Sequence, residues 1–234
     1  MSFGHPNRRA LLAVLLLSVV LPGSPRPLLA EPDVLWSIVT ECLDPAVADY
    51  CSTCKLPRTE APCATHRDCR ETTEVWAETP DYVAIRDRKM CGCLKEFVHG
   101  LAIPRTRVTG VEDPRRPEGI WEFAWHEACR RIPDETAIAL AVNPISWRSQ
   151  NQLHVHIVRL RSDARKDFEH ASVTRVERLD RVWAVAATTA KVAGWRDYGV
   201  LVAKDPSGGF LVVVEKGSPE GDFTENHCVR AGKY

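Results

Sequence analysis

The sequence has no excess of either charge, no apolar run long enough to cross a bilayer, and no internal repeat or low-complexity tract. Its 234 residues carry 31 basic and 31 acidic side chains. A nucleic-acid-binding protein would normally show a basic excess, so we expect no nucleic-acid partner. A small phosphate-bearing ligand needs only local positive charge and is not excluded. The length suffices for one sizeable domain with a true core, or for two small ones.

The main apolar run lies near the N-terminus, where Arg8 and Arg9 precede residues 10–21 and Pro22-Gly23 closes the run. A spanning helix needs about 20 apolar residues, so this shorter run is typical of an export signal. Ala30 offers a small residue for cleavage, and an uncleaved membrane anchor is the alternative. We expect residues 1–30 to form this signal or anchor and residues 31–234 to form a single domain.

Nine cysteines follow this segment, at positions 42, 51, 54, 63, 69, 91, 93, 129 and 228. Disulfides are the default in an exported chain, and the odd count leaves at least one thiol unpaired or paired between chains. We expect them to staple a cysteine-rich insert at about 51–78. A zinc knuckle around His66 is the less favoured alternative there. For Cys91 and Cys93 we expect structural pairing rather than redox chemistry.

Hydrophobic periodicity predicts an α+β fold with a mostly antiparallel sheet and two principal helices. The expected helices span 33–43, 118–132 and 168–193, with a loop-dominated segment at 44–80. The second long helix should turn Val173, Val176, Leu179, Trp183 and Ala187 inward. The expected strands span 82–85, 97–103, 136–142, 151–160, 198–203 and 210–214.

The stretch SQNQLHVHIV at 149–158 contains two histidines one residue apart. Strand side chains alternate between faces, so His154 and His156 should share one face, opposite Leu153, Val155 and Ile157. The alternative is that the two histidines are simply polar residues of a half-buried strand and face water. A zinc site would need a third ligand from elsewhere. The donors just before the pair favour a phosphate ligand instead: Ser146, Arg148, Ser149, Gln150, Asn151 and Gln152.

The run AIALAVNPISWRSQNQLHVHIVRLRSD resembles the active-site segment of the histidine-triad superfamily, and more closely the CDP-diacylglycerol pyrophosphatases of bacterial envelopes. The resemblance extends to Glu41-Cys42-Leu43, LAIPRTRVTGVEDP, DYGVLVAKDPSGGFLVVVEKG and Asn226-His227-Cys228. It covers most of the chain after the leader, with residues 51–78 departing as an extra insert. It implies a histidine-triad-like fold and a hydrolase that cleaves CDP-diacylglycerol to CMP and phosphatidate.

The resemblance implies a covalent nucleotidyl-histidine intermediate, with His156 as the nucleophile and His154 beside the reacting phosphate. Neutral imidazole is a competent nucleophile, because its unperturbed pKa is about 6.5. The implied phosphate-binding residues are Asn143, Arg148, Ser149 and Gln150, with His99 and Arg161 as possible supporting residues. Val158 stands where the parent superfamily has a third histidine, and the pyrophosphatase branch shares that departure. No metal or organic cofactor is implied.

The expected partners are therefore the lipid-nucleotide substrate and a membrane surface, at the periplasmic side of a bacterial inner membrane. Two other functions stay open on the residues alone. One is hydrolysis of a soluble nucleotide diphosphate by the same chemistry. The other is a non-enzymatic exported protein that binds metal through His154, His156 and thiols. The oligomeric state, the disulfide pairing and the acyl-chain specificity cannot be read from the sequence.

Overall fold

The structure is a computed structural model that describes residues 32–43, 58 and 73–228, together with Met1. Its described part contains an eight-stranded sheet in the order β1-β2-β3-β5-β4-β7-β8-β6. Every adjacent pair of strands in the sheet is antiparallel, so the predicted α+β class and antiparallel sheet are confirmed. The strands are β1 Val75–Glu78, β2 Tyr82–Arg86, β3 His99–Pro104, β4 Ile138–Val142, β5 Val155–Arg159, β6 Ser172–Val176, β7 Gly199–Lys204 and β8 Phe210–Glu215.

The helical elements are mostly short. The two longest are α3 Gly119–Arg131 and α5 Val182–Val192. The others are α1 Val34–Ser37, η1 Ile38–Cys42, η2 Arg88–Met90, η3 Glu135–Ala137, η4 Ile145–Trp147, α4 Ala164–Asp167, η5 Phe168–His170, η6 Leu179–Arg181 and α6 Pro219–Phe223. Among the described residues no helix is long and apolar enough to cross a membrane. The expected signal or anchor at 1–30 lies outside them.

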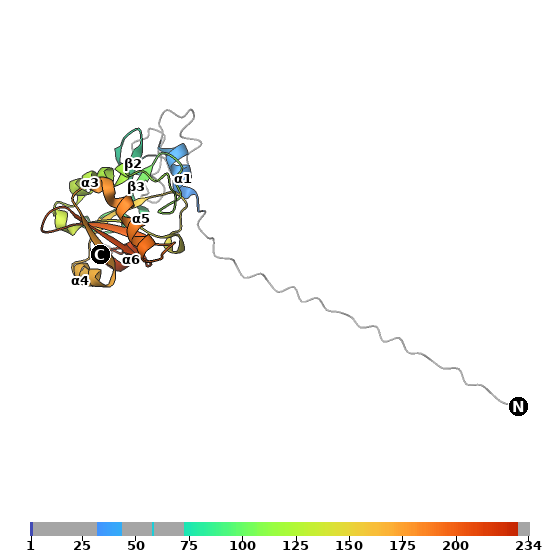
Figure 1. Cartoon of the computed structure of the whole chain (residues 1–234). Helices are drawn as coiled ribbons and strands as arrows, with labels where there is room; N and C mark the ends of the chain where they lie inside the picture. The colour runs from blue at the N-terminus through green and yellow to red at the C-terminus, as the bar shows by residue number, and fades with distance from the viewer. Residues whose placement is uncertain (2–31, 44–57, 59–72, 229–234) are drawn as a thin grey trace.

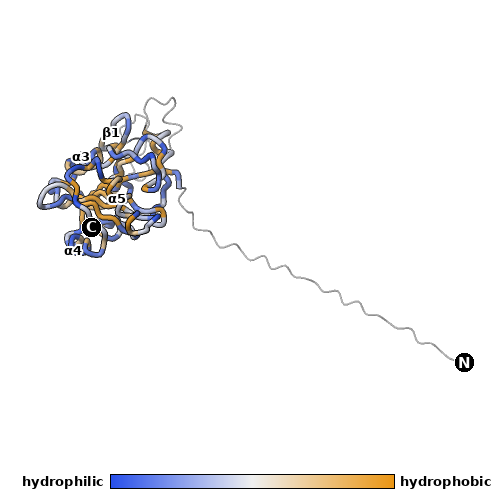
Figure 2. Tube along the Cα trace, in the orientation of Figure 1, coloured by the Kyte–Doolittle hydropathy of each residue, from blue (hydrophilic) through white to orange (hydrophobic). Residues whose placement is uncertain are grey.

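One face of the sheet is covered by α3 and α5, which lie together in Figure 1. Trp121 of α3 is fully buried, and its ring centroid lies 4.7 Å from that of Trp183 of α5. The Glu118 carboxylate, just before α3, accepts hydrogen bonds from the first backbone N–H groups of α5, at Trp183 and Ala184. The two helices therefore pack as one layer. Figure 2 shows hydrophobic residues in this layer and in the central strands.

The opposite face carries two separate hydrophobic clusters. In the first, α1 and η1 pack Leu35 and Ile38 against strands β2 and β3. In the second, Phe168 and Phe223 pack against the strands β4 and β7. The elements that form these clusters lie at different ends of the molecule, as the positions of α1 and α4 in Figure 1 show. The middle of this face is left for polar side chains.

The prediction of one helix over 168–193 is wrong in its first half. Residues 172–176 form the edge strand β6, paired in register with β8, and α5 begins only at Val182. Val173, which we expected inside, is 40% exposed. The segment SVTRV is rich in β-branched residues, which suit a pleated surface beside a partner strand. Pairing with β8 therefore outweighs the helical spacing of Val173 and Val176.

The predicted loop over 44–80 also conceals strand β1, which is paired with β2 through an irregular register. Most of the cysteine-rich insert lies outside the described residues. Cys93 forms a disulfide with Cys228, across 135 residues of sequence, and Cys42 and Cys91 are disulfide-bonded as well. Cys91 and Cys93 are thus both disulfide-bonded, as predicted, and Cys93 is bonded to Cys228. Among the described cysteines, Cys129 is free.

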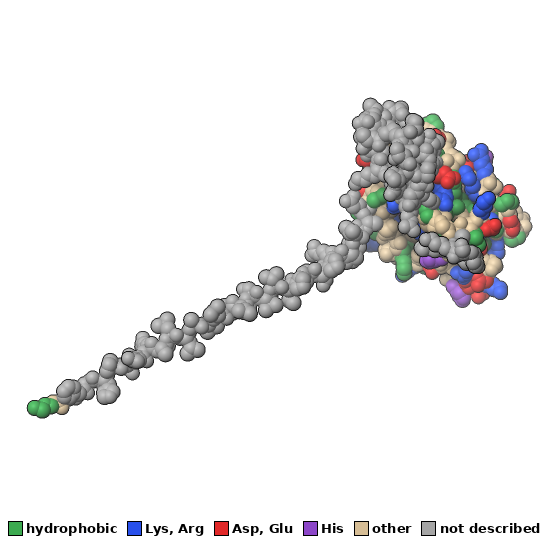
Figure 3. All heavy atoms as spheres, turned by 180° about the vertical axis from the view of Figure 1, so that it is seen from behind, with side chains coloured by type: hydrophobic (Ala, Val, Ile, Leu, Met, Phe, Trp, Pro, Cys, Tyr) green, Lys and Arg blue, Asp and Glu red, His purple; other side chains and the backbone are tan. Residues whose placement is uncertain are grey.

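Acidic and basic side chains lie interspersed on the face that Figure 3 shows, as the equal numbers of each in the sequence lead us to expect. The β7–β8 hairpin turns through Gly208 and Gly209, whose φ angles of 109° and 71° suit glycine. This is the glycine-bearing turn that the sequence predicts.

Candidate active site

The two histidines of SQNQLHVHIV lie on the open middle of the sheet face that α3 and α5 do not cover. His156 belongs to β5, where it is paired with Leu101 of β3 and Ala141 of β4. His154 directly precedes the strand, and the two ring centroids are 4.8 Å apart. The apolar neighbours pack in the core on the other face, as predicted: Leu153, Val155 and Ile157.

A third imidazole joins the pair from the neighbouring strand. His99 begins β3 and is paired with Val158 of β5. Its side chain is completely buried, and its Nε2 atom lies 3.1 Å from Nδ1 of His156. His99, predicted as a possible supporting residue, is therefore in direct contact with the proposed nucleophile.

A buried carboxylate completes this group. Glu220 of α6 places Oε2 3.3 Å from His156 Nε2 and Oε1 3.3 Å from His99 Nε2. Lys89 forms an ion pair with Oε1, and Asn143 Nδ2 donates a hydrogen bond of 2.8 Å to Oε2. Asn143, predicted as a phosphate ligand, thus donates its amide proton to a protein carboxylate.

The position of Glu220 follows from how α6 begins. Ser218 is the N-cap: its Oγ accepts a hydrogen bond from Gly221 N, and Pro219 follows at the first helical position. The same hydroxyl donates to Oδ1 of Asn143 over 3.0 Å. Because Asn143 directly follows β4, this bond fixes α6 against the end of that strand. The bond joins residues 75 apart in sequence.

Burial governs the protonation of these groups. Burial lowers the pKa of His99 to about 4 and lowers the pKa of His154 and His156 below 6.5. Burial alone would raise the pKa of Glu220, but the surrounding positive charge holds it below its usual range. Since the buried imidazoles are neutral near pH 7, the ammonium group of Lys89 is the charge that balances the carboxylate.

His99, His156 and Glu220 also form a set of donor atoms within 4.8 Å of one another, close enough to hold a metal ion. The set differs from the alternative of His154, His156 and thiols, since it takes a carboxylate and a different histidine. The carboxylate of this set is already occupied, because Lys89 and Asn143 bind it. A cation there would have to displace the ammonium group.

A cavity of about 360 Å³ opens over the site. One side of it is polar and the other apolar, as an amphiphilic ligand requires. The polar lining includes Lys89, Asn143, Ser149, His154, His156 and Glu220, and the apolar lining Val34, Leu35, Ile38, Ile85 and Leu101. The apolar side is the edge of the cluster built around α1 and η1.

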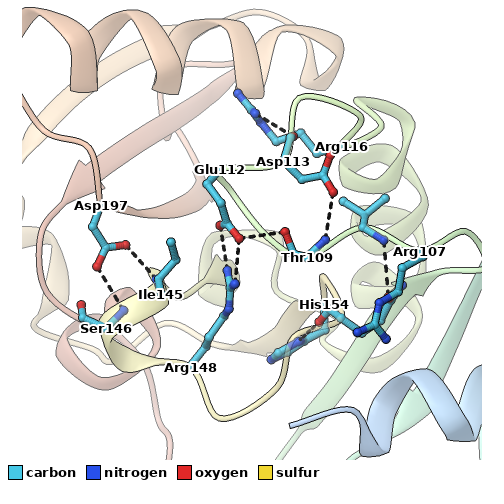
Figure 4. Close-up of polar contacts among 12 residues, drawn as sticks. Arg107, Thr109, Glu112, Asp113, Arg116, Ile145, Ser146, Arg148, His154 and Asp197 are labelled. Atoms are coloured by element: carbon cyan, nitrogen blue, oxygen red, sulfur yellow. Dashed lines mark hydrogen bonds and ion pairs between the residues drawn. The ribbon is translucent and has the colours of Figure 1, made fainter.

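The predicted phosphate ligand Arg148 lines the cavity, but its guanidinium group is paired with another residue. It donates two hydrogen bonds of 2.7 Å to the carboxylate of Glu112 (Figure 4). Glu112 also accepts a hydrogen bond from the Thr109 hydroxyl. Bidentate pairs of this kind fix geometry as well as charge. Arg148 thus ties the loop between β4 and β5 to residues 109–112.

Ser149 and Gln150, the two other predicted phosphate ligands, also line the cavity. Gln150 accepts a hydrogen bond from the backbone N–H of Leu35 and donates one to the carbonyl oxygen of Ser149. It therefore joins the loop to α1. Arg161, the remaining supporting candidate, does not line this cavity. Its guanidinium group pairs with Asp163 and Asp167 and donates to the carbonyl oxygen of Asp222 in α6.

The sequence did not indicate Glu220 or Lys89. Glu220 lies in a Ser-Pro-Glu start that is a recognisable helix N-terminus, but nothing in its spacing relates it to residue 156. Lys89 is one of many surface-type basic residues in the sequence. Only the folded chain brings Lys89 of η2 and Glu220 of α6 together beside His156 of β5.

A family model described as "CDH: CDP-diacylglycerol pyrophosphatase" matches residues 30–191. The match includes His99, the loop at 143–151 and the histidine pair, and it ends before α6. It spans more than two thirds of the 234 residues. The chain therefore belongs to the CDP-diacylglycerol pyrophosphatase family, and it is a hydrolase.

Proposed function

We propose that this protein hydrolyses the diphosphate bond of CDP-diacylglycerol through a covalent nucleotidyl-histidine, with His156 as the nucleophile. The products are CMP and phosphatidate. We also propose that the fold is histidine-triad-like and that the strand β3 contributes His99 to the active site. The family supports hydrolysis of this substrate. The covalent step depends on one observation, the state of the His156 side chain.

His156 Nε2 is buried and forms no hydrogen bond with the described residues, although Glu220 Oε2 lies 3.3 Å away, whereas Nδ1 faces His99 Nε2 at 3.1 Å. A proton on Nδ1, donated to His99, leaves the lone pair of Nε2 free. Burial keeps the pKa of His156 below 6.5, so that the ring is neutral near pH 7. A neutral, oriented imidazole that lines the cavity is the group that nucleophilic attack on phosphorus requires.

In the first step the Nε2 lone pair attacks the phosphorus of the cytidylyl group. The bond from this phosphorus to the bridging oxygen breaks, and phosphatidate leaves with the electron pair. In the second step a water oxygen attacks the same phosphorus, the bond to Nε2 breaks, and CMP and a proton are released. His154, 4.8 Å from His156 between ring centroids, lies beside the reacting phosphoryl group.

In the absence of substrate, the Glu220 carboxylate occupies the hydrogen-bond donors that the phosphoryl oxygens would need. Lys89 and Asn143 both bind its carboxylate, and these are the kinds of donor that bind and stabilise a diphosphate. The substrate takes over the contacts of Lys89 and Asn143, and Glu220 moves aside. The carboxylate then lies near His99 and His156 and offsets the positive charge that develops on the attacking ring.

We place this activity at the periplasmic surface of a bacterial inner membrane, with residues 1–30 as export signal or anchor. The disulfide between Cys93 and Cys228 supports an oxidising compartment. The substrate is itself a membrane lipid, which supports a membrane surface as the place of work.

The test is hydrolysis of CDP-diacylglycerol labelled in the cytidylyl phosphate, followed by rapid acid-free denaturation and peptide mapping. The parent protein should release CMP and carry a cytidylyl group on His156. His156→Ala should lose at least about a thousandfold in kcat and trap no label. His126→Ala, an exposed histidine of α3, serves as the control and should behave like the parent. Near-parental turnover by His156→Ala, or label on another residue, would refute the mechanism.

A further inference from the structure

The turn η4 exposes two large apolar side chains at the mouth of the cavity. Ile145 is 49% exposed and Trp147 is 62% exposed, and Trp147 also lines the cavity. All seven tryptophans of the sequence lie in the described residues, and Trp147 is the most exposed of them. Single exposed apolar residues are ordinary. Two of them on one short turn, next to a catalytic cavity, call for a binding partner.

Hydrogen bonds hold the backbone of the turn that carries these side chains. The Asp197 carboxylate accepts the backbone N–H groups of Ile145 and Ser146, at 2.8 and 3.0 Å (Figure 4). The backbone N–H groups of Trp147 and Arg148 both donate to the carbonyl oxygen of Pro144 at 3.1 Å. Arg148 is fixed to Glu112 immediately afterwards. The apolar groups are therefore presented by a rigid turn.

We propose that Ile145 and Trp147 insert into the lipid bilayer and hold the mouth of the cavity against it. The inference rests on the proposed function, because the substrate is a lipid whose acyl chains stay in the membrane while its diphosphate reaches His156. Tryptophan is the residue that prefers the membrane–water interface. Arg88 lines the same cavity and is exposed, and exposed basic residues attract the anionic head groups of a membrane.

The contact can be measured on the full chain by quenching of tryptophan emission with brominated acyl chains, which act only at short range. The vesicles contain equal amounts of phosphatidylcholine and phosphatidylglycerol, with or without bromine. We expect Trp147→Phe to remove most of the bromine-dependent quenching. Trp195→Phe is the matched control, since Trp195 is partly exposed and contributes no lining to the cavity. Unchanged quenching in Trp147→Phe overturns the proposal.

Activity gives a second, independent readout. Ile145→Ser should lower the rate on CDP-diacylglycerol embedded in these vesicles about fivefold, because part of the apolar contact with the bilayer is lost. The same variant should keep the parental rate on a short-chain CDP-diacylglycerol dispersed as monomers. Val192→Ser, at an 86% exposed position at the end of α5, should keep both rates. Equal losses in the two serine variants would overturn the proposal.

Two outcomes separate this inference from others. If the parent hydrolyses neither the embedded nor the dispersed substrate, the proposed function fails, whatever the quenching shows. If Ile145→Ser instead converts a dimer to a monomer in light scattering, with quenching unchanged, the turn binds a second copy of the chain and the membrane proposal is overturned.

Discussion

Glu220 carries the negative charge nearest to the two buried imidazoles, and its effect on them has a definite sign. The carboxylate raises the pKa of His156, against the larger effect of burial. A histidine nucleophile is active only when neutral, so its pKa sets the acid limb of the pH–rate profile. The charge on Glu220 therefore limits activity on the acidic side.

We expect Glu220→Gln to move the acid limb of kcat to lower pH. Glutamine keeps the shape of the side chain but removes the charge, so the pKa of His156 falls further and the ring stays neutral in more acidic solution. The measurement is kcat against pH on a dispersed short-chain substrate. Glu225→Gln, at an exposed position outside the cavity, should keep the parental profile. An identical limb in Glu220→Gln would show that this charge does not act on the reacting ring.

The histidine cluster shows how far single residues could be predicted. The shared face of His154 and His156 follows from the alternation of a strand alone. The contact between His99 and His156 does not, because it depends on β3 lying beside β5 in a particular register. Glu220 was further out of reach, since it comes from α6, after the last strand. Strand periodicity is local information, whereas this site is made by pairing across the sheet.

At the scale of elements, the loop between β4 and β5 contains Arg148, to which the sequence and the structure assign different roles. The resemblance implies that Arg148 binds phosphate, whereas the structure pairs it with Glu112 over two bonds of 2.7 Å. Its side chain is only 9% exposed. Buried charged pairs are costly to break from one side, because the remaining charge loses its partner.

We expect Glu112→Gln to reproduce much of the effect of Arg148→Ala if Arg148 acts by holding the loop. Each change should lower the free energy of unfolding by about 2 kcal/mol, the range for hydrogen bonds to charged groups. The double variant should lose little more than either single one, because both remove the same contact. The measurements are urea unfolding and kcat with KM. A fully active Glu112→Gln beside an inactive Arg148→Ala would instead assign Arg148 to the substrate.

The element predictions succeeded where a segment has one strong pattern. Helix α3 lies within one residue of the predicted bounds, because Trp121, Ala124 and Trp125 bury one continuous stripe. They failed where a short segment fits two patterns. Residues 172–176 satisfy helical spacing as well as strand composition, and only the unpaired edge of β8 decides between them. Such an edge is not visible in the local sequence.

The disulfide between Cys93 and Cys228 joins the segment before β3 to the segment after α6. It therefore closes a loop of 135 residues that contains six of the eight strands of the sheet, β3 to β8. We expect Cys228→Ser to lower the free energy of unfolding by about 2–5 kcal/mol, as for native disulfides. Urea unfolding without reductant is the measurement. Cys129→Ser, which removes a free thiol, should change the stability far less. Equal stability of the parent and Cys228→Ser would mean that this bridge does not constrain the unfolded chain.

For the whole molecule, two kinds of buried group link stability to pH near neutrality: the buried imidazoles, and Glu215, whose pKa burial raises to about 7. The pKa of His99 is about 4 in the folded protein and 6.5 without burial, chiefly because burial disfavours the charged ring. Above pH 6.5 the ring is neutral in both states and stability does not depend on it. As the pH falls from 6.5 to about 4, the unfolded chain binds a proton that the folded protein does not bind.

We therefore expect His99 to remove about 3 kcal/mol of stability as the pH falls from 6.5 to 4, since a difference of one in pKa corresponds to about 1.4 kcal/mol. Glu215 acts in the opposite direction over this interval, because its pKa is raised in the folded protein. His99→Gln should be less stable than the parent at pH 7, but its free energy of unfolding should fall less steeply over this interval. His126→Gln, at an exposed position, should keep the parental slope. The measurement is urea unfolding at a series of pH values. If His99→Gln and the parent show the same slope, the pKa of His99 is the same in the folded and the unfolded protein. Burial would then not be what keeps His99 neutral as the acceptor of the Nδ1 proton of His156.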